Sequence, residues 1–539
     1  MSGSTLRENR TGPQTRHDSS LILKSLPYAL ALFFLLWSLR GVGANNIIDT
    51  DAARHAMNGS FILDLIREGK LLHPIAYGKE YYADFPALSL PFHPPLFPAI
   101  ESLFFAVFGV NVFAARLAVA LAVAISVLLF YRLILATHGS RLLAILAIAT
   151  FCLWRHSRAV ASDVMLEFPA LVFTLAALYM VRDLDTGKYP LRRGLAFALL
   201  AGAAVWTKQH AVFLGLVPWF IVLFTFRWRL LLQKTIWVSS IVFGVQVIGL
   251  SLLALPFRGT GVDQVAPANE IGEIFTHNLR FYLESIAGTL GLAPAILLGL
   301  CIVAAAVLKP VTAGRQRPAL YWSWALSAFT VLLLLGPFDE RYLFFVYPAL
   351  AVIAYASLFR LASMVFPGRL AWYVPVAVGA YCIVMGLMAG PFFLSGPAQS
   401  AALVVSGTPQ RVLYCGSTDG NFIFAVRTLD PQRQTTVIPG DKLPEADLSP
   451  ANFEAFARRY SIDRIVIEDS TRRQACEDLL AAPTASMHLE HRLPLNSSSS
   501  RWRKGSLSLY KLTHRAPVPA EPLEIPVPKI GQEVQIGLK

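Results

Sequence analysis

The hydrophobic residues of this chain gather into long blocks that alternate with short polar turns. Many blocks approach the length of about 20 residues that a helix needs to cross the hydrocarbon core of a bilayer. A globular core does not need such blocks, so the pattern predicts a polytopic α-helical membrane protein with about eleven to thirteen spans. We expect spans at residues 27–44, 112–133, 141–155, 164–181, 194–206, 211–226, 235–256, 286–308, 319–337, 341–360 and 370–393.

One further apolar segment, residues 94–109, begins with two prolines. We interpret it as a helix that lies along the membrane interface, within a long loop at residues 45–111, and not as a span. If it crossed the bilayer instead, the C-terminus would move to the cytoplasmic side.

Charge patterning orients the spans. Of the 539 residues, 55% are apolar and only 15% charged, and the net charge is +13. Many Lys and Arg residues lie in alternate short loops, which indicates membrane topology and not a nucleic-acid partner. The positive-inside rule places residues 1–26 and the basic loops in the cytoplasm. The loop 45–111 and all residues after 394 then lie on the other side. The basic loops fall near residues 132–141, 182–193, 227–234, 309–317 and 360–369.

The C-terminal part, residues 400–515, has the pattern of a small α/β domain on the outer side of the membrane. Alternating strand and helix patterns predict strands at 411–415, 464–467 and 506–512 and helices at 419–428 and 451–460. Cys415 and Cys476 both fall in this region and could form a disulfide. Residues 516–539 are rich in proline, and we expect a flexible tail.

Several polar groups stand at the predicted outer ends of spans. If these turns converge, they form one polar cavity of mixed charge at the outer membrane face. Any single member could instead be a solvated turn residue; Asp163 could cap a helix, and Lys208 could extend to the interface. Glu167 is harder to explain in that way, because it lies about one turn inside an apolar span, where an unpaired carboxylate is costly. Arg158 and Lys208 are its candidate partners. The members are Asp51, Arg54, His55, His93, Arg158, Asp163, Glu167, Lys208, Arg341 and Tyr342.

The order of motifs along residues 45–350 resembles the GT-C superfamily of membrane glycosyltransferases, in particular the protein O-mannosyltransferase and aminoarabinose lipid A transferase relatives. Their patterns include Asp-Glu-Ala-Arg-Tyr-Ala, Lys-Pro-Pro-Leu, Met-Leu-Asp-Met-Pro and Leu-Thr-Lys. The segments that match are Asp51-Ala-Ala-Arg-His-Ala, His93-Pro-Pro-Leu-Phe, Phe108-Gly-Val-Asn-Val-Phe-Ala-Ala-Arg-Leu, Met165-Leu-Glu-Phe-Pro, Trp206-Thr-Lys and Glu340-Arg-Tyr-Leu-Phe-Phe-Val-Tyr-Pro-Ala-Leu.

The resemblance implies a GT-C catalytic module over residues 27–396, with interfacial helices in the first outer loop and a polyprenyl-phosphate-linked sugar as donor. It implies that Asp51 is the catalytic aspartate and that Glu167 stands at the second acidic position. Ala52 replaces the glutamate of the family's acidic pair, and His93 replaces a lysine thought to meet the phosphate. These departures put the phosphate contacts and the use of a divalent metal in question, so no cofactor is assigned and the metal site is unknown.

Chemistry supports the same roles. A phosphate leaving group is a stable anion, so transfer needs one carboxylate base and cations at the phosphate, with inversion at the anomeric carbon. Our hypothesis makes Asp51 the base, with Glu167 orienting the acceptor. Asp163, Arg158, His55 and Tyr342 would support the acceptor or the site. The residues expected to hold the donor phosphate are Lys208, Arg341, Arg54 and His93.

Rival classes share these features. A transporter or flippase of lipid-linked sugars, a non-catalytic scaffold of the same fold, and a ligase that moves whole oligosaccharides stay open as alternatives. Transporters often contain internal repeats, and none is evident in this chain. We expect an integral protein of a bacterial inner or plasma membrane. Its acceptor, whether a protein, lipid A or another glycan, is not specified by the sequence.

Overall fold

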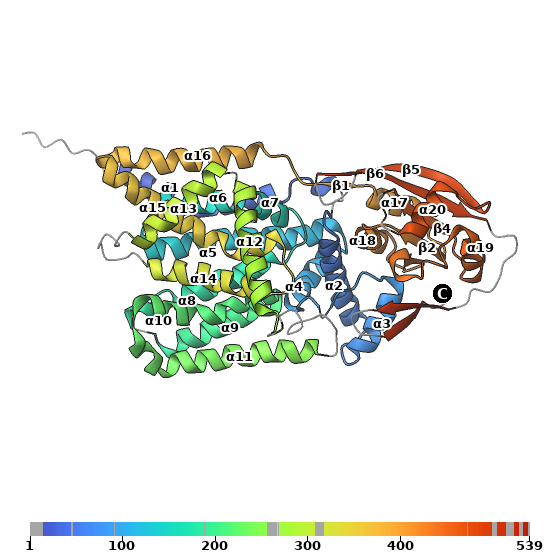
Figure 1. Cartoon of the computed structure of the whole chain (residues 1–539), viewed down its shortest axis with the longest axis horizontal. Helices are drawn as coiled ribbons and strands as arrows, with labels where there is room; N and C mark the ends of the chain where they lie inside the picture. The colour runs from blue at the N-terminus through green and yellow to red at the C-terminus, as the bar shows by residue number, and fades with distance from the viewer. Residues whose placement is uncertain are drawn as a thin grey trace, which may run out of the picture.

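The protein, described here as a computed structural model, has a long helical bundle at one end and a smaller domain of strands and helices at the other (Figure 1). The structure describes residues 14–44, 47–90, 92–187, 189–255, 267, 269–290, 292–307, 317–469, 471, 473–498, 504–513, 522–527 and 532–536.

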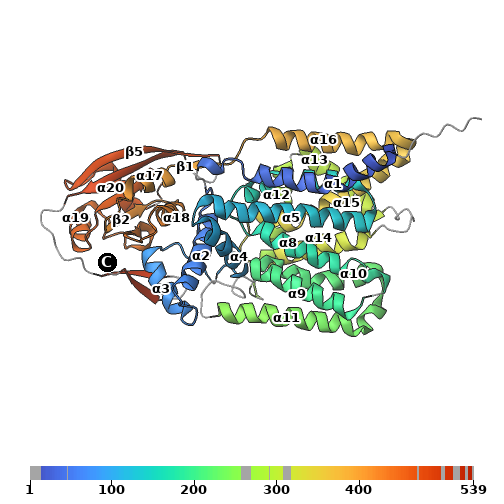
Figure 2. The same cartoon turned by 180° about the vertical axis from the view of Figure 1, so that it is seen from behind.

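The bundle helices lie mostly side by side along the long axis of the molecule, and Figure 2 shows α1 and α5 adjacent on its rear face. Local sequence sets several helix ends. Asn111 caps the start of α5 by accepting a hydrogen bond from Ala114 N, and Gly139 ends it in the left-handed conformation at φ 71°. The helices are α1 (Gln14–Ser38), α5 (Val112–His138), α6 (Arg141–Leu153), α7 (Arg155–Ala161), α8 (Glu167–Val181), α9 (Leu191–Thr207), α10 (Val217–Thr225), α11 (Lys234–Ala254), α12 (Ile271–Leu290), α13 (Leu292–Val307), α14 (Pro318–Leu334), α15 (Tyr347–Val365) and α16 (Tyr373–Met388).

Among the described residues, four helices are long and apolar enough to cross a bilayer by themselves. These are Val112–His138, Lys234–Ala254, Tyr347–Val365 and Gly368–Met388. Helices α6 and α7 pass the same test as a pair, but they are bent by 72°. Other apolar helices, such as Leu96–Phe108 and Pro318–Leu334, are shorter. The count of about eleven spans stays a prediction, whereas the mostly helical, membrane-embedded fold is confirmed.

Several expected spans have different bounds in the structure, and two of them are divided. The span expected at 341–360 begins as a 3-10 turn at Glu340–Phe345, and α15 starts only at Tyr347. Asp339 caps that turn by accepting a hydrogen bond from Arg341 N, and Pro348 stands in the first turn of α15. The span expected at 286–308 is divided between the end of α12 and α13.

The first outer loop folds into three helices at the end of the bundle that faces the smaller domain. They are α2 (Thr50–Arg67), α3 (Pro74–Asp84) and α4 (Leu96–Phe108). Helices α2 and α4 pack together and lie across the end of the bundle, not along it (Figure 1). The interfacial role of residues 94–109 stays a prediction.

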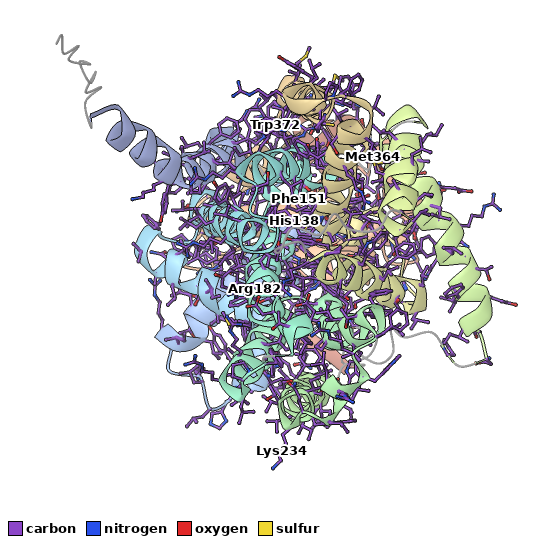
Figure 3. All side chains as sticks on the ribbon, turned by 90° about the vertical axis from the view of Figure 1, so that its left-hand side faces the viewer. His138, Phe151, Arg182, Lys234, Met364 and Trp372 are labelled. Carbon is purple, nitrogen blue, oxygen red and sulfur yellow. A yellow bond between two sulfur atoms is a disulfide. The ribbon has the colours of Figure 1, made fainter. Side chains whose placement is uncertain are left out.

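The basic loops expected near residues 132–141, 182–193, 227–234 and 360–369 lie at the opposite end of the bundle; of the loop expected near 309–317, residues 309–316 lie outside the described residues. Figure 3 looks onto this end, where Arg182 and Lys234 are labelled. Within one loop Arg193 Nη1 lies 2.7 Å from Asp183 Oδ2, and Arg317 pairs with Asp185 of that loop. The chain therefore separates its basic turns from the Asp51 end by the length of the bundle.

The smaller domain is built on a six-stranded sheet in the order β1-β5-β6-β4-β2-β3. Strand β2 is parallel to β3 and β4, whereas β6 is antiparallel to both β4 and β5. The strands are β1 (Leu394–Ser395), β2 (Gln410–Cys415), β3 (Thr435–Pro439), β4 (Arg464–Glu468), β5 (Met487–Ser497) and β6 (Gly505–Leu512), and the helices are α17 (Pro397–Val404), α18 (Asp419–Leu429), α19 (Pro450–Arg459) and α20 (Gln474–Ala481).

The predicted strands at 411–415, 464–467 and 506–512 and both predicted helices are present in this domain, whereas the sequence pattern missed β3 and the long strand β5. The flexible tail expected at 516–539 is partly wrong. Strands β7 (Leu523–Val527) and β8 (Gln532–Ile536) form an antiparallel hairpin, and β8 packs against α3. Ile525 and Ile536 are buried there, which provides the apolar contact that a proline-rich composition concealed.

The sheet joins two hydrophobic cores because side chains alternate along a strand. Val412 and Tyr414 of β2 belong to the large core shared with the bundle, whereas Leu413 and Cys415 face a separate core under α19 and α20. Cys415 and Cys476 form a disulfide in that second core, with their Cα atoms 6.1 Å apart. The domain therefore packs on the bundle through buried apolar contacts, not through a loose linker.

Candidate active site

Breaks at four helix ends bring the main predicted residues together at the outer end of the bundle. Asp51 lies in the first turn of α2, and Glu167 is the first residue of α8. Lys208 follows the end of α9 in extended conformation, and Arg341 lies in the 3-10 turn before α15. Carboxylates are favoured at helix N-termini, because the backbone N–H groups there are unpaired and the helix dipole is positive.

Asp51 is paired with Arg341. Arg341 Nη2 donates a hydrogen bond of 2.8 Å to Asp51 Oδ2, across 290 positions of sequence. Burial raises the pKa of the Asp51 carboxyl, but the positive charge of Arg341, with a smaller effect from His93, outweighs burial and holds the pKa far below its usual range. Asp51 is therefore ionised throughout the physiological pH range.

Glu167 is paired with Lys208, and this resolves the choice of partner. Lys208 Nζ donates a hydrogen bond of 2.7 Å to Glu167 Oε1, and the Glu167 side chain is only 1% exposed. The alternative partner, Arg158, is not part of this cluster. Its guanidinium donates to the carbonyl of Leu153 and, at 3.4 Å, to that of Gly390. Arg158 therefore ties α7 to the chain after α16, and its expected place beside Glu167 is wrong.

Aromatic and histidine rings surround the two pairs. The His55 ring lies 4.3 Å from that of His93, and the His210 ring lies 4.2 Å from that of Tyr342. Tyr342 is also close to Lys208 Nζ, at 5.8 Å from the ring centroid. Burial lowers the pKa of His55 to about 3, against the opposing attraction of Asp51. His55 is therefore neutral and can serve as a hydrogen-bonding group, not as a cation.

Asp163 has a separate, supporting role. Its buried carboxylate accepts hydrogen bonds from the backbone N–H groups of Ile48, at 3.2 Å, and Asp49, at 2.8 Å. Asp49 in turn caps α2 by accepting a hydrogen bond of 2.9 Å from Asp51 N. Burial raises the pKa of Asp163 to about 7, although these N–H groups oppose the shift. Asp163 thus holds the segment that leads into Asp51, and its role differs from contact with an acceptor.

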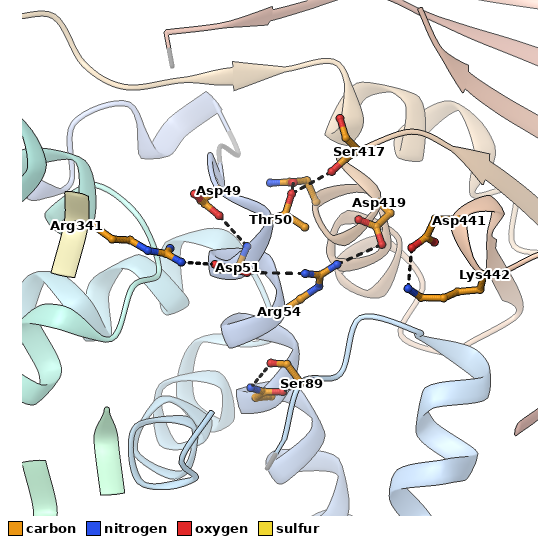
Figure 4. A network of polar contacts seen from close by, with 12 residues as sticks. Asp49, Thr50, Asp51, Arg54, Ser89, Arg341, Ser417, Asp419, Asp441 and Lys442 are labelled. Carbon is orange, nitrogen blue, oxygen red and sulfur yellow. Dashed lines mark hydrogen bonds and ion pairs between the residues drawn. The ribbon is translucent and has the colours of Figure 1, made fainter. Parts of the chain in front are cut away.

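Arg54 lies between two carboxylates, as Figure 4 shows. Arg54 Nη1 is 3.8 Å from Asp51 Oδ1, and Arg54 Nη2 is 3.6 Å from Asp419 Oδ2 at the start of α18. Sequence analysis missed Asp419. Its position directly after the parallel strand β2 was an available signal, because ligand and active-site residues gather at the carboxyl ends of parallel strands.

A metal site is not built from these side chains. The described part of the chain has no group of three or more His, Cys, Asp or Glu residues placed to hold an ion. Asp51 and Glu167 each accept a charge-assisted hydrogen bond from a basic side chain. Because the residues do not fit a metal, we assign no step to one, and the divalent metal stays an untested prediction.

Comparisons with known proteins connect this arrangement to a fold. Residues 92–252 match the sequence family of dolichyl-phosphate-mannose-protein mannosyltransferases. No curated protein sequence matches the chain significantly. Among solved structures, ArnT from Cupriavidus metallidurans bound to undecaprenyl phosphate is similar, with a TM-score of 0.55, 17% identity, and alignment over 90% of this chain and 97% of ArnT. The chain has the GT-C fold.

The apo state of the same ArnT gives a TM-score of 0.56 at 16% identity, over 91% of this chain and 98% of ArnT. The fold class and the superfamily resemblance are therefore confirmed. The family match covers His93, Glu167 and Lys208 of this chain but not Asp51 or Arg341. The pairing of those two residues rests on the geometry of this chain.

Proposed function

We propose that this GT-C protein transfers a sugar from a polyprenyl-phosphate-linked donor to an extracytoplasmic acceptor, with Asp51 as the general base. The observation that carries the proposal is the hydrogen bond from Arg341 to Asp51, next to the Lys208–Glu167 pair, at the end of the bundle opposite the basic loops. A carboxylate base beside two cations is the set of groups that transfer from a lipid phosphate requires.

In the proposed reaction the acceptor hydroxyl or amine loses its proton to Asp51. Its oxygen or nitrogen forms a bond to the anomeric carbon as the bond from that carbon to the phosphate oxygen breaks. The electron pair of the broken bond leaves with the polyprenyl phosphate. Because this is one displacement, the anomeric configuration inverts. No acid need protonate the leaving group, since a phosphate is already a stable anion.

The strong pairing of Asp51 with Arg341 raises a question of base strength. A carboxylate whose pKa is far below its usual range is a weak base. The donor phosphate offers Arg341 a second anion, and a guanidinium can bind phosphate with two parallel hydrogen bonds. As Arg341 turns to the phosphate, burial raises the pKa of Asp51 and strengthens it as a base. Donor binding would thus activate the base.

Lys208 can help hold the phosphate without leaving Glu167, because an ammonium has three N–H donors and Glu167 takes one of them. Three buried polar atoms of the cluster, Glu167 Oε2, His55 Nδ1 and His210 Nδ1, make no hydrogen bond among the described residues. Buried polar atoms in folded proteins are seldom left unpaired. A sugar hydroxyl would donate to Glu167 Oε2, whereas each histidine nitrogen can pair with a sugar hydroxyl or, where it carries the proton, donate to a phosphate oxygen.

The remaining parts of the proposal follow from similarity and charge. The ArnT structure in question was solved with undecaprenyl phosphate, which supports a polyprenyl phosphate as the lipid. The separation of the basic loops from Asp51 supports an outer active site under the positive-inside rule. We place the protein in a bacterial inner or plasma membrane, with a protein, lipid A or another glycan as acceptor.

The test is release of free polyprenyl phosphate. Purified protein in liposomes is incubated with a panel of undecaprenyl-phosphate-linked sugars and an envelope fraction from cells that lack the protein. We expect the Asp51→Asn variant to fold and insert but to lose activity by about a thousandfold. Glu284→Gln is the matched control, because the Glu284 side chain is 65% exposed and its ion pair among the described residues is an exposed i,i+4 contact with Arg280.

Three outcomes would overturn the proposal. Normal turnover by Asp51→Asn would remove Asp51 as the base. Movement of labelled lipid-linked sugar across the bilayer, without release of lipid phosphate from any donor, would favour a transporter. Release of a pyrophosphate-linked lipid from an oligosaccharide donor alone would favour a ligase.

A further inference from the structure

The smaller domain contacts the active-site helix directly. Thr50 Oγ1, next to Asp51, donates to the carbonyl of Ser417 at 3.2 Å, and Asn421 Nδ2 donates to the carbonyl of Ile47 at 2.9 Å. The contact is close: a Cβ on Gly420 would lie 3.0 Å from Thr50 Cγ2. The chain around Asp51 is therefore held by residues that follow it by more than 360 positions.

Arg54 is the charged part of this contact. It belongs to α2, one turn after Asp51, and its guanidinium reaches both Asp51 and Asp419 (Figure 4). The Asp419 side chain is only 9% exposed, and Arg54 is the cation within ion-pair distance of it among the described residues. The charges of Asp441 and Tyr82 also raise the pKa of Arg54. Lys442 Nζ lies 2.7 Å from Asp441 Oδ2 and forms an ion pair with it.

The sheet fixes the position of Asp419. The loop between β2 and α18 is held by Glu468, at the end of the neighbouring strand β4. Glu468 accepts hydrogen bonds of 2.9 Å from Ser417 N and Thr418 N and one of 2.7 Å from the Tyr414 hydroxyl. A carboxylate with this many donors is a rigid support. Asp419 is thus presented to Arg54 from the carboxyl edge of parallel strands and not from an unsupported loop.

We propose that Asp419 is a positioning residue of the transfer reaction: it draws the Arg54 guanidinium away from Asp51, so that the smaller domain tunes the base. The inference rests on the proposed function. Asp51 already has one strong partner in Arg341, and a second cation at hydrogen-bonding distance would hold it as a weak base even after Arg341 turned to the phosphate. Asp419 keeps Arg54 at 3.8 Å from Asp51, beyond a good hydrogen bond.

The proposal predicts dependence on Arg54. In Asp419→Asn, Arg54 loses its competing carboxylate and moves onto Asp51, so kcat should fall about tenfold while the KM for the lipid-linked donor stays unchanged. In an Arg54→Gln background no guanidinium is present to move, and Asp419→Asn should have little further effect. A residue needed only for folding would reduce activity equally in both backgrounds.

The experiment is a double-mutant cycle on the full-length protein in liposomes. It uses wild type, Asp419→Asn, Arg54→Gln and the double variant, with apparent melting temperature measured for each. Asp478→Asn is the control, because it removes an exposed carboxylate of the same domain. Asp478 lies on α20, where its side chain accepts a hydrogen bond from Gln474. Asp419→Glu, which keeps the charge, should retain more activity than Asp419→Asn and serves as the test variant if Asp419→Asn does not fold.

Equal losses in the two backgrounds, or a fall in melting temperature with unchanged kcat, would overturn the positioning role. These outcomes are distinct from failure of the proposed function, in which the wild-type protein itself releases no polyprenyl phosphate from any donor.

Discussion

At the scale of single residues, two opposing effects determine the pKa of the Asp51 carboxyl at the outer end of the bundle. Asp51 is shielded from water, which favours its protonated form, and it faces Arg341, which favours its ionised form. His55 shows the result of burial on a base: its pKa falls to about 3, and it stays neutral. The properties of this site therefore depend on which cation contacts Asp51 at a given stage of the reaction.

We expect Arg341→Gln to shift the acidic limb of the rate profile to higher pH. Arg341 is the main group that lowers the pKa of Asp51, and burial then raises that pKa without opposition. Asp51 becomes protonated, and useless as a base, over a wider acidic range. The pH dependence of kcat/KM between about pH 4 and about pH 9 measures the shift, because this ratio reports the free enzyme, in which Arg341 contacts Asp51. A loss of about a hundredfold from weaker phosphate binding is expected in addition. An acidic limb at the wild-type position would contradict this control of Asp51 by Arg341.

At the scale of secondary-structure elements, the site is made of ends and interruptions. Helix α8 begins at Glu167, α9 ends just before Lys208, and a 3-10 turn carries Arg341. Side chains along one continuous helix would point outward in different directions. The helix ends described here lie close together, so their side chains meet in one space. The buried Glu167–Lys208 pair links two of these ends, so it should contribute to packing as well as to phosphate binding.

Replacing one member of the Glu167–Lys208 pair should reduce the stability of the protein more than replacing both. Glu167→Gln alone leaves the Lys208 ammonium buried without a counter-charge, which costs about 3 kcal/mol. The double variant Glu167→Gln with Lys208→Met buries no unpaired charge, so it should be more stable than the sum of the two single losses. Thermal unfolding in detergent, followed by tryptophan fluorescence, measures all four proteins. Strictly additive losses would show that the pair is not coupled.

The chain's elements also explain which parts of the structure could be predicted. The apolar blocks and the order of motifs indicated the GT-C fold, and the cost of a buried carboxylate singled out Glu167. The partner of Glu167 could not be chosen between Arg158 and Lys208, because the bend after α6 turns Arg158 toward Leu153 and Gly390. Asp419 was missed because its partner, Arg54, lies far away in sequence, and its place after strand β2 suggests a site without showing that this edge of the sheet meets the bundle.

At the scale of the whole molecule, the protein has basic turns at one end of a bundle, the candidate active site at the other, and a sheet domain packed over that site (Figure 1). One hydrophobic core continues from the bundle into the face of the sheet that carries Val412 and Tyr414. Such continuity favours a fixed domain position over hinge motion. The stability of the sheet domain should therefore influence activity.

The disulfide between Cys415 and Cys476 provides a test at this scale. It lies beneath the loop that leads to Asp419 and closes a segment of 61 positions. Replacing either cysteine with serine should destabilise the domain by about 2–4 kcal/mol. Limited proteolysis in urea measures the loss of stability. The control is Cys382→Ser, because Cys382 is a half-buried cysteine that forms no disulfide. Equal resistance of Cys415→Ser and wild type would mean that the bond does not form in cells, where an oxidising compartment is required.

The hydrogen bond between Thr50 and Ser417 also determines the order in which parts of the chain can assemble during synthesis. Ribosomes make α2 early, yet the residues that hold its first turn are added only after the entire bundle has been synthesised, 367 positions later. A growing chain therefore completes its helical bundle before this contact at the first turn of α2 can form. The contact must wait for synthesis and folding of the last hundred or so residues. The surroundings of Asp51 are thus completed only when biosynthesis is finished.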